Sequence, residues 1–567
     1  MMSRIGLFLS ALFLASIAFA QQSAAPQKAD NEWWKHAVIY EIYPRSFQDS
    51  NGDGIGDING ITSRLDYLKD LGINAIWISP MYPSPGIDTG YDVSDYTAIS
   101  PEYGTMADFN HLVAEAKKRD IRVIMDYVIN HTSDQHPWFK ESRSSRTNPK
   151  RDWYIWHDGK AQGEPPNNWQ SWFGHSAWTY DATTKQYYYH YFYSQQPDLN
   201  WRNPQVHKAM EDVLRFWLER GVSGFRIDAV SRLFEDPGLH DDPYLTGRNV
   251  YGDRNIEHKY TDNYPEVNDV LKELRRVVDK YPGDPVLITE ADEPNIAELT
   301  KLYGDGDEVQ LPMDFQIADA NTLSAPKFRK LFGDVENNSA HGQPEYFFSN
   351  HDQPRQWDRY GDGKHNDQIA KLMAALLLTT RGTPQMYYGE ELGMRTTDPT
   401  RIEDVHDPIG KLGWPKEKGR DGERTPMQWN ASKEAGFTAS TKPWLPVPPV
   451  AEKYNVEKEK QDPDSILNAY KRLLFLRKSE PALRDGSYMA INEDDPNVFA
   501  FLRKSKDSTV LVALNMSAES RTISAKMPSS GETHATPLYV SPDSAEKVVS
   551  LDHLTLQPFG VIVARVK

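Results

Sequence analysis

Residues 207–230 read HKAMEDVLRFWLERGVSGFRIDAV, a helical pattern that leads into a short apolar segment. Up to Gly221 the apolar side chains recur every three or four residues, which predicts an amphipathic helix. After Gly221 the chain is typical of a buried strand, since a short apolar run follows a helix and a glycine. A helix that leads directly into a buried strand is the repeating unit of a parallel α/β fold.

The same alternation of strand and helix recurs through residues 37–390. Because at least five such units follow one another, the sequence favours a closed (β/α)8 TIM barrel over an open sheet. The predicted strands are HAVIYEIYP (36–44), INAIWISP (73–80), IRVIMDYVINH (121–131), VSGFRIDAV (222–230) and PVLITEAD (285–292); the predicted helices include ITSRLDYLKDLG (61–72), MADFNHLVAEAKKRD (106–120) and PEVNDVLKELRRVVDKYPG (265–283).

Two departures from this rhythm divide the chain into domains. Residues 132–203, after the third strand, are rich in Trp, Tyr, Asn and Pro and too long for a plain loop, so a small inserted domain is expected. Residues 481–567 carry short alternating runs such as VFAFLRK and TVLVALNM, which predict an antiparallel β-sandwich. The barrel would then comprise residues 33–131 and 204–480.

The first twenty residues have the layout of a signal peptide. They carry one Arg, an apolar stretch and the sequence Ala18-Phe19-Ala20 before Gln21. An uncleaved anchor is the alternative. With residues 21–32 as a polar leader, the mature chain is expected to be secreted or periplasmic, although it has no cysteine and therefore no disulfide framework.

The composition is that of a folded protein with an acidic surface. The formal net charge is −17, which argues against nucleic acid or an anionic membrane as partner. We expect no membrane association after signal cleavage, a small-molecule partner, and a monomer or weak homo-oligomer.

Arg226 and Asp228 lie two positions apart in the predicted strand and therefore point to the same face. Burying two charges costs several kcal/mol each unless they are paired. They form either a structural ion pair or part of a catalytic site.

Further polar residues follow other predicted strands, where the active sites of β/α barrels lie. A lone carboxylate at a strand end is usually a helix cap or a satisfied core group, but three from separate strands are harder to explain in that way. These residues are Asp126, Asn130 and His131 from one strand, Glu290 from another, and His351 with Asp352 from YFFSNHD (346–352).

A pair of carboxyl groups roughly 5–5.5 Å apart is the catalytic apparatus of a retaining glycosidase. In this hypothesis Asp228 attacks the sugar, and the neighbouring Arg226 keeps it ionised. Glu290 follows the apolar run VLIT, an environment that suits a general acid. His131 and His351 would hydrogen-bond sugar hydroxyls.

Seven motifs, in order, give the chain a resemblance to the α-amylase superfamily, glycoside hydrolase family 13, and within it to the α-glucosidase and oligo-1,6-glucosidase branch. The resemblance covers nearly all of the mature chain. The motifs are DYVINH (126–131), QPDLNW (196–201), GFRIDAV (224–230), ITEAD (288–292), FFSNHD (347–352), GTPQMYYGEELGM (382–394) and RTPMQW (424–429).

The resemblance implies a role for each matching residue. Asp228 is the nucleophile, Glu290 the acid/base, and Asp352 the carboxylate that stabilises the transition state. His131, Arg226 and His351 would line the subsite of the reacting sugar.

Exo-acting relatives add a second set of residues, carried here by DTGYD (88–92). Asp88 and Tyr91 match residues that close the pocket on the non-reducing glucose, with Arg424 opposite Asp88. Asp88 could instead cap a turn. Phe173 and Phe192 match aromatic residues at the rim where the leaving sugar lies, or could belong to the core.

The residue after the predicted nucleophile is Ala229. In this branch Val at that position accompanies α-1,6 preference, and Ala or Thr accompanies α-1,4 preference. A β-branched side chain changes the room beside the leaving sugar. We therefore expect α-1,4 bonds.

The stretch DSNGDGIGD (49–57) places oxygen donors at alternate positions and resembles the first nine positions of an EF-hand loop. The usual glutamate at position twelve is absent, because Gly60 stands there. The branch has a calcium site in this loop, so structural Ca2+ is expected; a metal-free polar turn is the alternative. The predicted ligands are Asp49, Asn51, Asp53, Ile55 through its carbonyl, and Asp57.

The leading hypothesis is an exported retaining α-glucosidase that acts on the terminal glucose of maltose and short oligosaccharides. A transglucosylase or a sugar isomerase of the sucrose or trehalose type would use the same machinery, as would an oligo-1,6-glucosidase. A non-enzymatic transporter subunit is disfavoured, because the three carboxylates are present and no later apolar stretch could span a bilayer.

Overall fold

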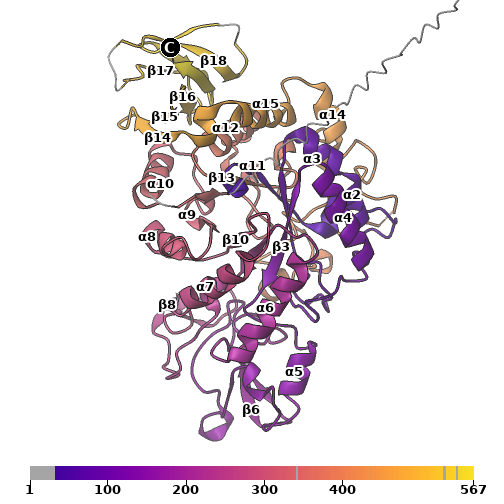
Figure 1. Cartoon of the computed structure of the whole chain (residues 1–567). Helices are drawn as coiled ribbons and strands as arrows, with labels where there is room; N and C mark the ends of the chain where they lie inside the picture. Colours follow the sequence, from indigo (N-terminus) through magenta and orange to yellow (C-terminus); the bar gives the residue numbers. More distant parts are fainter. Residues whose placement is uncertain (1–31, 340–341, 441, 528–530, 545–546, 567) are drawn as a thin grey trace, which may run out of the picture.

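The computed structural model describes residues 32–339, 342–440, 442–527, 531–544 and 547–566 (Figure 1). The predicted signal peptide and all of the leader except Glu32 lie outside this part of the chain. Within it, no helix combines the length and the apolar character that crossing a membrane requires.

Eight parallel strands form the central sheet, and each strand pairs with the next one along the chain except at the step from β11 to β12. The ring closes because the last strand pairs with the first, and a parallel bridge joins Met313 to Glu345. This arrangement confirms the predicted barrel. The strands are β1 (Ile39–Ile42), β2 (Ala75–Ile78), β3 (Arg122–Val128), β7 (Gly224–Asp228), β10 (Val286–Thr289), β11 (Leu311–Pro312), β12 (Glu345–Tyr346) and β13 (Thr383–Tyr387).

Helices cover the outside of the barrel (Figure 1). The helix α6 (Pro204–Leu218) shows why they begin where they do: Asn203 caps the first turn and Pro204 occupies the first helical position. The other helices are α1 (Pro44–Phe47), α2 (Ile58–Ser63), α3 (Leu65–Leu71), α4 (Met106–Lys118), α7 (Val267–Val278), α8 (Ile296–Leu299), α9 (Phe315–Ala318), α10 (Ala325–Asn338), α11 (Gln356–Tyr360), α12 (Asn366–Thr379), α13 (Pro408–Gly413) and α14 (Val456–Gln461).

The helix predicted over residues 61–72 is in fact two helices, α2 and α3, which meet at Arg64. The Arg64 side chain donates to Gln48 Oε1 from Nε at 2.7 Å and lies over the ring of Trp429. These tertiary contacts accompany a break that the helical periodicity gave no reason to expect. The helix α3 does end at the expected glycine, Gly72, whose φ of 111° is in the left-handed region.

Residues 132–203 carry α5 (Pro137–Ser142) and a three-stranded antiparallel sheet. An aromatic cluster that includes Trp169, Trp178 and Tyr189 packs this segment together. It lies at the end of the molecule opposite the C-terminal sheet (Figure 1). Its strands are β4 (Trp156–His157), β5 (Trp178–Asp181) and β6 (Gln186–Tyr189).

The connection after β7 contains a hairpin that the sequence analysis did not predict. Its strands are β8 (Tyr244–Arg248) and β9 (Arg254–Ile256). The inserted segment contacts it and the residues just before it: Gln170 Nε2 donates to the Arg254 carbonyl in the hairpin, and Trp169 Nε1 donates to the His240 carbonyl. The hairpin thus extends the inserted segment towards the mouth of the barrel.

The C-terminal region is an antiparallel sheet of six strands with a second sheet of two strands. Apolar residues of both sheets, among them Leu511, Ala513, Ile523 and Leu554, form one core. The predicted antiparallel β-sandwich is therefore confirmed. The helices α15 (Ile466–Ser479) and α16 (Pro481–Asp485) precede it in the chain. Its strands are β14 (Ser487–Ile491), β15 (Val498–Lys504), β16 (Thr509–Asn515), β17 (Arg521–Ile523), β18 (His534–Ser541), β19 (Val549–Ser550), β20 (Leu554–Leu556) and β21 (Val561–Val566).

Candidate active site

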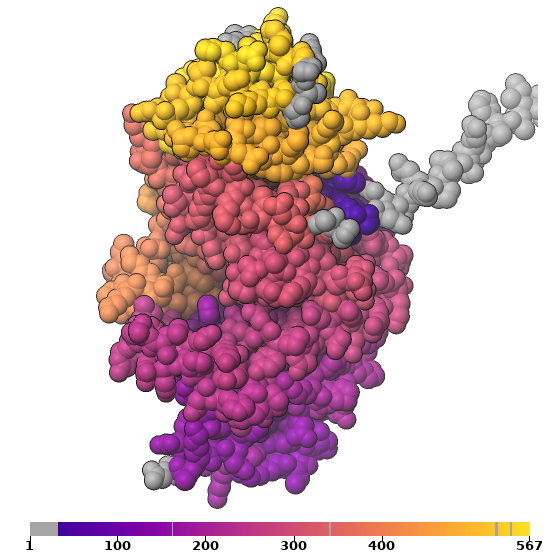
Figure 2. Space-filling model, turned by 90° about the vertical axis from the view of Figure 1, so that its left-hand side faces the viewer, coloured from indigo at the N-terminus to yellow at the C-terminus, as the bar shows by residue number. Residues whose placement is uncertain are grey.

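A cavity of about 620 Å³ is lined by residues that follow the barrel strands, by the inserted segment and by the segment 409–420. Figure 2 shows the surface hollowed between an orange segment near residue 400 and a magenta segment near residue 250. Eight residues predicted from the sequence line it: Asp88, Tyr91, His131, Phe173, Phe192, Asp228, Glu290 and Asp352.

Arg226 lies fully buried beneath this cavity and ties carboxylates of three neighbouring strands together. Its Nη1 is 2.7 Å from Asp228 Oδ1 and 3.2 Å from Asp126 Oδ1, and its Nη2 is 2.7 Å from Glu290 Oε2. The parallel register makes this possible, because Asp126 on β3 is paired directly with Arg226 on β7. Arg226 and Asp228 therefore form a buried ion pair and also belong to the candidate catalytic site, so the two interpretations of this strand are both correct.

The protonation of Asp228 depends on several neighbours. Burial raises the pKa of Asp228 and the Arg226 guanidinium lowers it, but the nearby carboxyl groups of Glu290 and Asp126 raise it again, so the pKa lies well above its ordinary value. The expectation that Arg226 by itself keeps Asp228 ionised is therefore incomplete.

Glu290 is held by the backbone as well as by Arg226. The amide of Ala229 donates to Glu290 Oε2 at 3.2 Å. Ala229 has φ +48° and ψ +38°, a left-handed conformation that turns the chain sharply after β7. A pattern of residue types does not reveal such a turn, so the sequence analysis missed this contact.

Asp352 is held in its ionised form by its neighbours. Burial by itself would raise the pKa of Asp352. The neighbouring His351 and the guanidinium groups of Arg420 and Arg424 lower it by more than burial raises it, so the pKa of Asp352 lies well below its usual range. Its Oδ1 is 2.9 Å from Arg420 Nη1 and 2.7 Å from Arg424 Nη2. The site therefore holds a fixed negative charge next to the Asp228–Glu290 pair.

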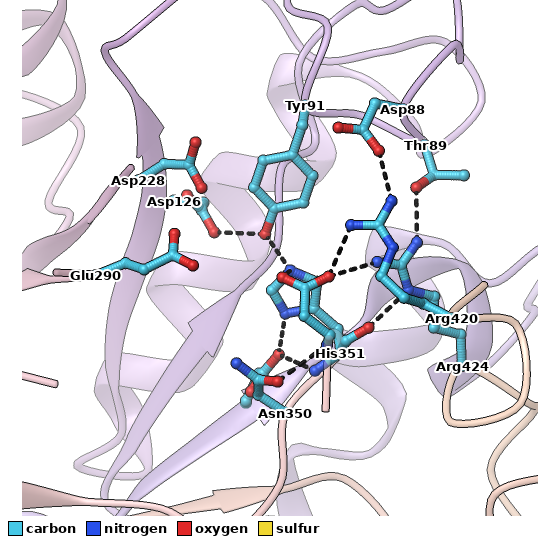
Figure 3. Close-up of polar contacts among 12 residues, drawn as sticks. Asp88, Thr89, Tyr91, Asp126, Asp228, Glu290, Asn350, His351, Arg420 and Arg424 are labelled. Carbon is cyan, nitrogen blue, oxygen red and sulfur yellow. Dashed lines mark hydrogen bonds and ion pairs between the residues drawn. The ribbon is translucent and has the colours of Figure 1, made fainter. Parts of the chain in front are cut away.

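The arginine paired with Asp88 is Arg420 and not Arg424, which the sequence analysis placed opposite Asp88. Asp88 Oδ1 pairs with Arg420 Nη2 at 2.7 Å, whereas Arg424 donates to Thr89 Oγ1 and to the His351 carbonyl (Figure 3). Arg420 is four residues before Arg424, outside the RTPMQW motif that carried the prediction. The path of the chain after α13 brings Arg420 to Asp88, and this is a tertiary effect.

Tyr91, His131 and His351 form a buried polar layer. The Tyr91 hydroxyl is 3.0 Å from Asp126 Oδ2 and 2.7 Å from His351 Nε2, and the Tyr91 and His351 rings are stacked (Figure 3). His131 Nε2 is 3.1 Å from the Tyr91 carbonyl. Burial lowers the pKa of His131 to about 4, so its imidazole is neutral near pH 7.

Aromatic residues form the outer part of the cavity. Phe173 and Phe192 both line it, with ring centroids 5.6 Å apart, so neither is a plain core residue. Trp172 was not predicted from the sequence; 51% of its surface is exposed. Further lining residues that the sequence analysis missed are Tyr191, Ser231, Arg232, Tyr251, Asp292, Phe315, Asp319, Gln353, Ile409, Glu417 and Arg420.

The loop 49–57 turns its side-chain oxygens towards its own backbone. Asp49 Oδ1 accepts from the Asn51 amide, Asp53 Oδ1 from the Ile55 amide, and Asp57 Oδ1 from the Gly60 amide as the cap of α2. In the part of the chain that the structure describes, no three His, Cys, Asp or Glu side chains cluster as metal ligands would. The oxygen donors suit Ca2+ chemically, and calcium binding stays a prediction.

The fold and these side chains define a glycoside-processing enzyme. Residues 41–486 match the family model described as alpha amylase, catalytic domain, and the chain belongs to this family, glycoside hydrolase family 13.

Individual members of the family are similar to this chain over most of its length. The chain is 44% identical to a probable alpha-glucosidase of Rhizobium meliloti (strain 1021), over 87% of this chain and 91% of that protein. It is 40% identical to the oligo-1,6-glucosidase of Parageobacillus thermoglucosidasius, over 94% and 99%. Among solved structures, an isomaltulose synthase mutant from Erwinia rhapontici NX5 matches with a TM-score of 0.87 and 38% identity, over 95% and 100%.

Proposed function

We propose that this protein is an exported retaining α-glucosidase. It removes the terminal non-reducing glucose from maltose and short oligosaccharides and prefers α-1,4 bonds. The observation that carries the proposal is the convergence of Asp228, Glu290 and Asp352 on one cavity, with the Asp88–Arg420 ion pair in its wall.

The residues can divide the reaction between them. Asp228 attacks the anomeric carbon while Glu290 protonates the departing glycosidic oxygen, which gives a glucosyl ester of Asp228. Glu290 then removes a proton from water, water attacks the anomeric carbon, and Asp228 leaves with overall retention of configuration. Asp352 supplies negative charge next to the positive charge that develops on the sugar ring.

The wall of the cavity supports action on a chain end. Asp88, Arg420 and Asp352 present alternating charges that can hydrogen-bond several hydroxyls of a single glucose. The preference for α-1,4 bonds rests on Ala229, whose small side chain lines the same cavity.

A second candidate function is glucosyl transfer or sucrose isomerisation. It is favoured by the close match to an isomaltulose synthase and to an alpha-glucosyl transfer enzyme with a TM-score of 0.86 and 38% identity, over 94% of this chain and 99% of that one. Water and a second sugar hydroxyl can attack the same covalent intermediate.

One experiment separates these functions. Purified protein is incubated with maltose, isomaltose, sucrose and trehalose, and the anomeric protons are followed by NMR. Early release of α-glucose from maltose, with little from isomaltose, is the expected result. Early β-glucose would contradict the retaining mechanism, and new disaccharides without free glucose would establish the second candidate.

We also propose that Ca2+ binds the loop 49–57, through Asp49, Asn51, Asp53, the Ile55 carbonyl and Asp57. A ligand that binds only the folded protein raises its stability. Removing calcium with EDTA should therefore lower the melting temperature by several degrees, and adding Ca2+ should restore it. An Asp53→Asn variant should respond less; an unchanged melting temperature in EDTA would contradict the site.

A further inference from the structure

Behind the catalytic carboxylates lies a buried contact that the proposed mechanism does not use. Glu41, on β1, is fully buried, and its Oε1 is 2.7 Å from His351 Nδ1 and 3.2 Å from the His351 amide. Its Oε2 accepts from Gln385 Nε2 at 3.4 Å. Within the described residues, no Lys or Arg side chain forms an ion pair with this carboxyl.

The contacts of His351 Nε2, on the side of the ring away from Glu41, require a hydrogen on that nitrogen. Arg226 is paired with Asp126, so Asp126 is an acceptor, and the Tyr91 hydroxyl donates its single hydrogen to it. His351 Nε2 is 2.7 Å from the same hydroxyl oxygen and 3.2 Å from Asp352 Oδ2. The Tyr91 hydroxyl oxygen and Asp352 Oδ2 can then only accept a hydrogen bond from His351, so His351 Nε2 carries a hydrogen and donates it.

One further proton lies between His351 Nδ1 and Glu41 Oε1. If the nitrogen held it, an imidazolium would lie buried next to Asp352 but among the three guanidinium groups of Arg226, Arg420 and Arg424. The carboxylate of Glu41 would have Arg226 nearby but also the carboxylates of Asp352 and Asp126. Two charges at full burial are costly even when they are paired with each other, and each would also have neighbours of its own sign. If Glu41 holds the proton, both groups are neutral and the hydrogen bond remains.

We propose that Glu41 is a positioning residue that stays protonated and donates to His351 Nδ1, so that His351 keeps its hydrogen on Nε2. The ring then donates towards Tyr91 and Asp352 in the wall of the cavity. This inference rests on the proposed function, because it assigns Nε2 a role in holding Asp352 for the reacting sugar.

The test compares two variants. Glu41→Gln can still donate to Nδ1 through its amide, so it should retain activity within about fivefold and keep the pH profile of the parent. Glu41→Leu offers no donor, so Nδ1 loses its hydrogen bond and the ring is no longer held in the orientation in which Nε2 donates to Tyr91 and Asp352. A small misplacement of a side chain that holds a reacting group can cost up to about 100-fold, and we expect kcat/KM to fall by at least about 30-fold.

Activity is measured on whichever glucosyl donor the parent uses, so an unexpected substrate does not obscure the result. Equal losses in both variants would show that the glutamate charge is needed and would overturn the proposal. Full activity in both would reduce Glu41 to a packing residue. If Glu41→Leu does not fold, the pH profile of Glu41→Gln decides, because a changed profile contradicts a protonated Glu41.

A measurement without substrate tests the proton assignment separately from the function. Histidine labelled with 15N at the ring, with His351→Gln for assignment, should show one protonated and one bare ring nitrogen for His351 at pH 7. Two protonated ring nitrogens would overturn the proposal, whatever sugar the enzyme uses.

Discussion

The inner and outer parts of the cavity are built in different ways. The inner part consists of charged side chains that follow barrel strands and are fixed by ion pairs, as around Arg226. The outer part consists of aromatic side chains from the inserted segment and the β8–β9 hairpin, including Trp172 and Tyr251. From this difference we predict that the barrel supplies the chemistry and that the connecting segments affect which leaving group is accepted.

The largest effect is expected at the centre of the inner part. Asp228→Asn should lose at least about 10³-fold in kcat while it still binds glucose, because the covalent step needs a carboxylate. Initial rates and calorimetric binding of glucose test this. Asp319→Asn, the same exchange at another cavity residue, should stay within about fivefold; similar losses in both variants would contradict the assignment of Asp228.

The next effect is expected in the wall between the two parts. Arg420→Met leaves Asp88, Asp352 and Asp407 without their shared partner. Loss of one partner of a buried charge pair costs about 2–5 kcal/mol, so kcat/KM should fall by roughly 30-fold or more. Arg420→Lys restores the positive charge but not the planar guanidinium that bonds several carboxylates at once, so it should recover only part of the rate. An active Arg420→Met would show that the wall does not hold the sugar.

A low pH should break the ion pair between Asp407 and Arg420 and so lower the free energy of unfolding. Burial raises the pKa of Asp407, but Arg420 lowers it more, to about 2, so the folded value lies below the ordinary 3.8. The resulting stabilisation of about 2 kcal/mol is present above pH 4 and is lost as the pH falls through 2. Urea unfolding from pH 5 to pH 2 measures this slope. Asp407→Asn should flatten it, and an unchanged slope would contradict the pairing.

The smallest effect is expected at the rim. Trp172→Ala should raise KM for maltose by about fivefold and leave kcat nearly unchanged, because an exposed ring contributes to binding more than to the chemical step. Tyr180→Ala removes another half-exposed aromatic that does not line the cavity, and it should change neither constant. A loss of kcat in Trp172→Ala would contradict the assignment of the rim to binding and of the centre to the chemical step.

Much of the inner part could be predicted from residue types and spacing. Asp228, Glu290 and Asp352 each follow an apolar strand pattern, and parallel strands in a barrel bring such positions to one end. The pairing of Asp88 could not be predicted, because Arg420 and Arg424 are equally plausible partners in sequence. The hairpin β8–β9 was missed because Tyr244, Leu245 and the rest of its first strand are exposed and show no alternation.

The sequence by itself determined the repeating strand and helix units, the C-terminal sandwich and the set of strand-end carboxylates. These follow from local periodicity and from the fixed geometry of parallel strands. Only the tertiary structure decided which arginine faces Asp88, how Ala229 turns its amide towards Glu290, and how Glu41 meets His351. Those contacts join residues far apart in the chain or depend on a single backbone turn, and local patterns carry no information about either.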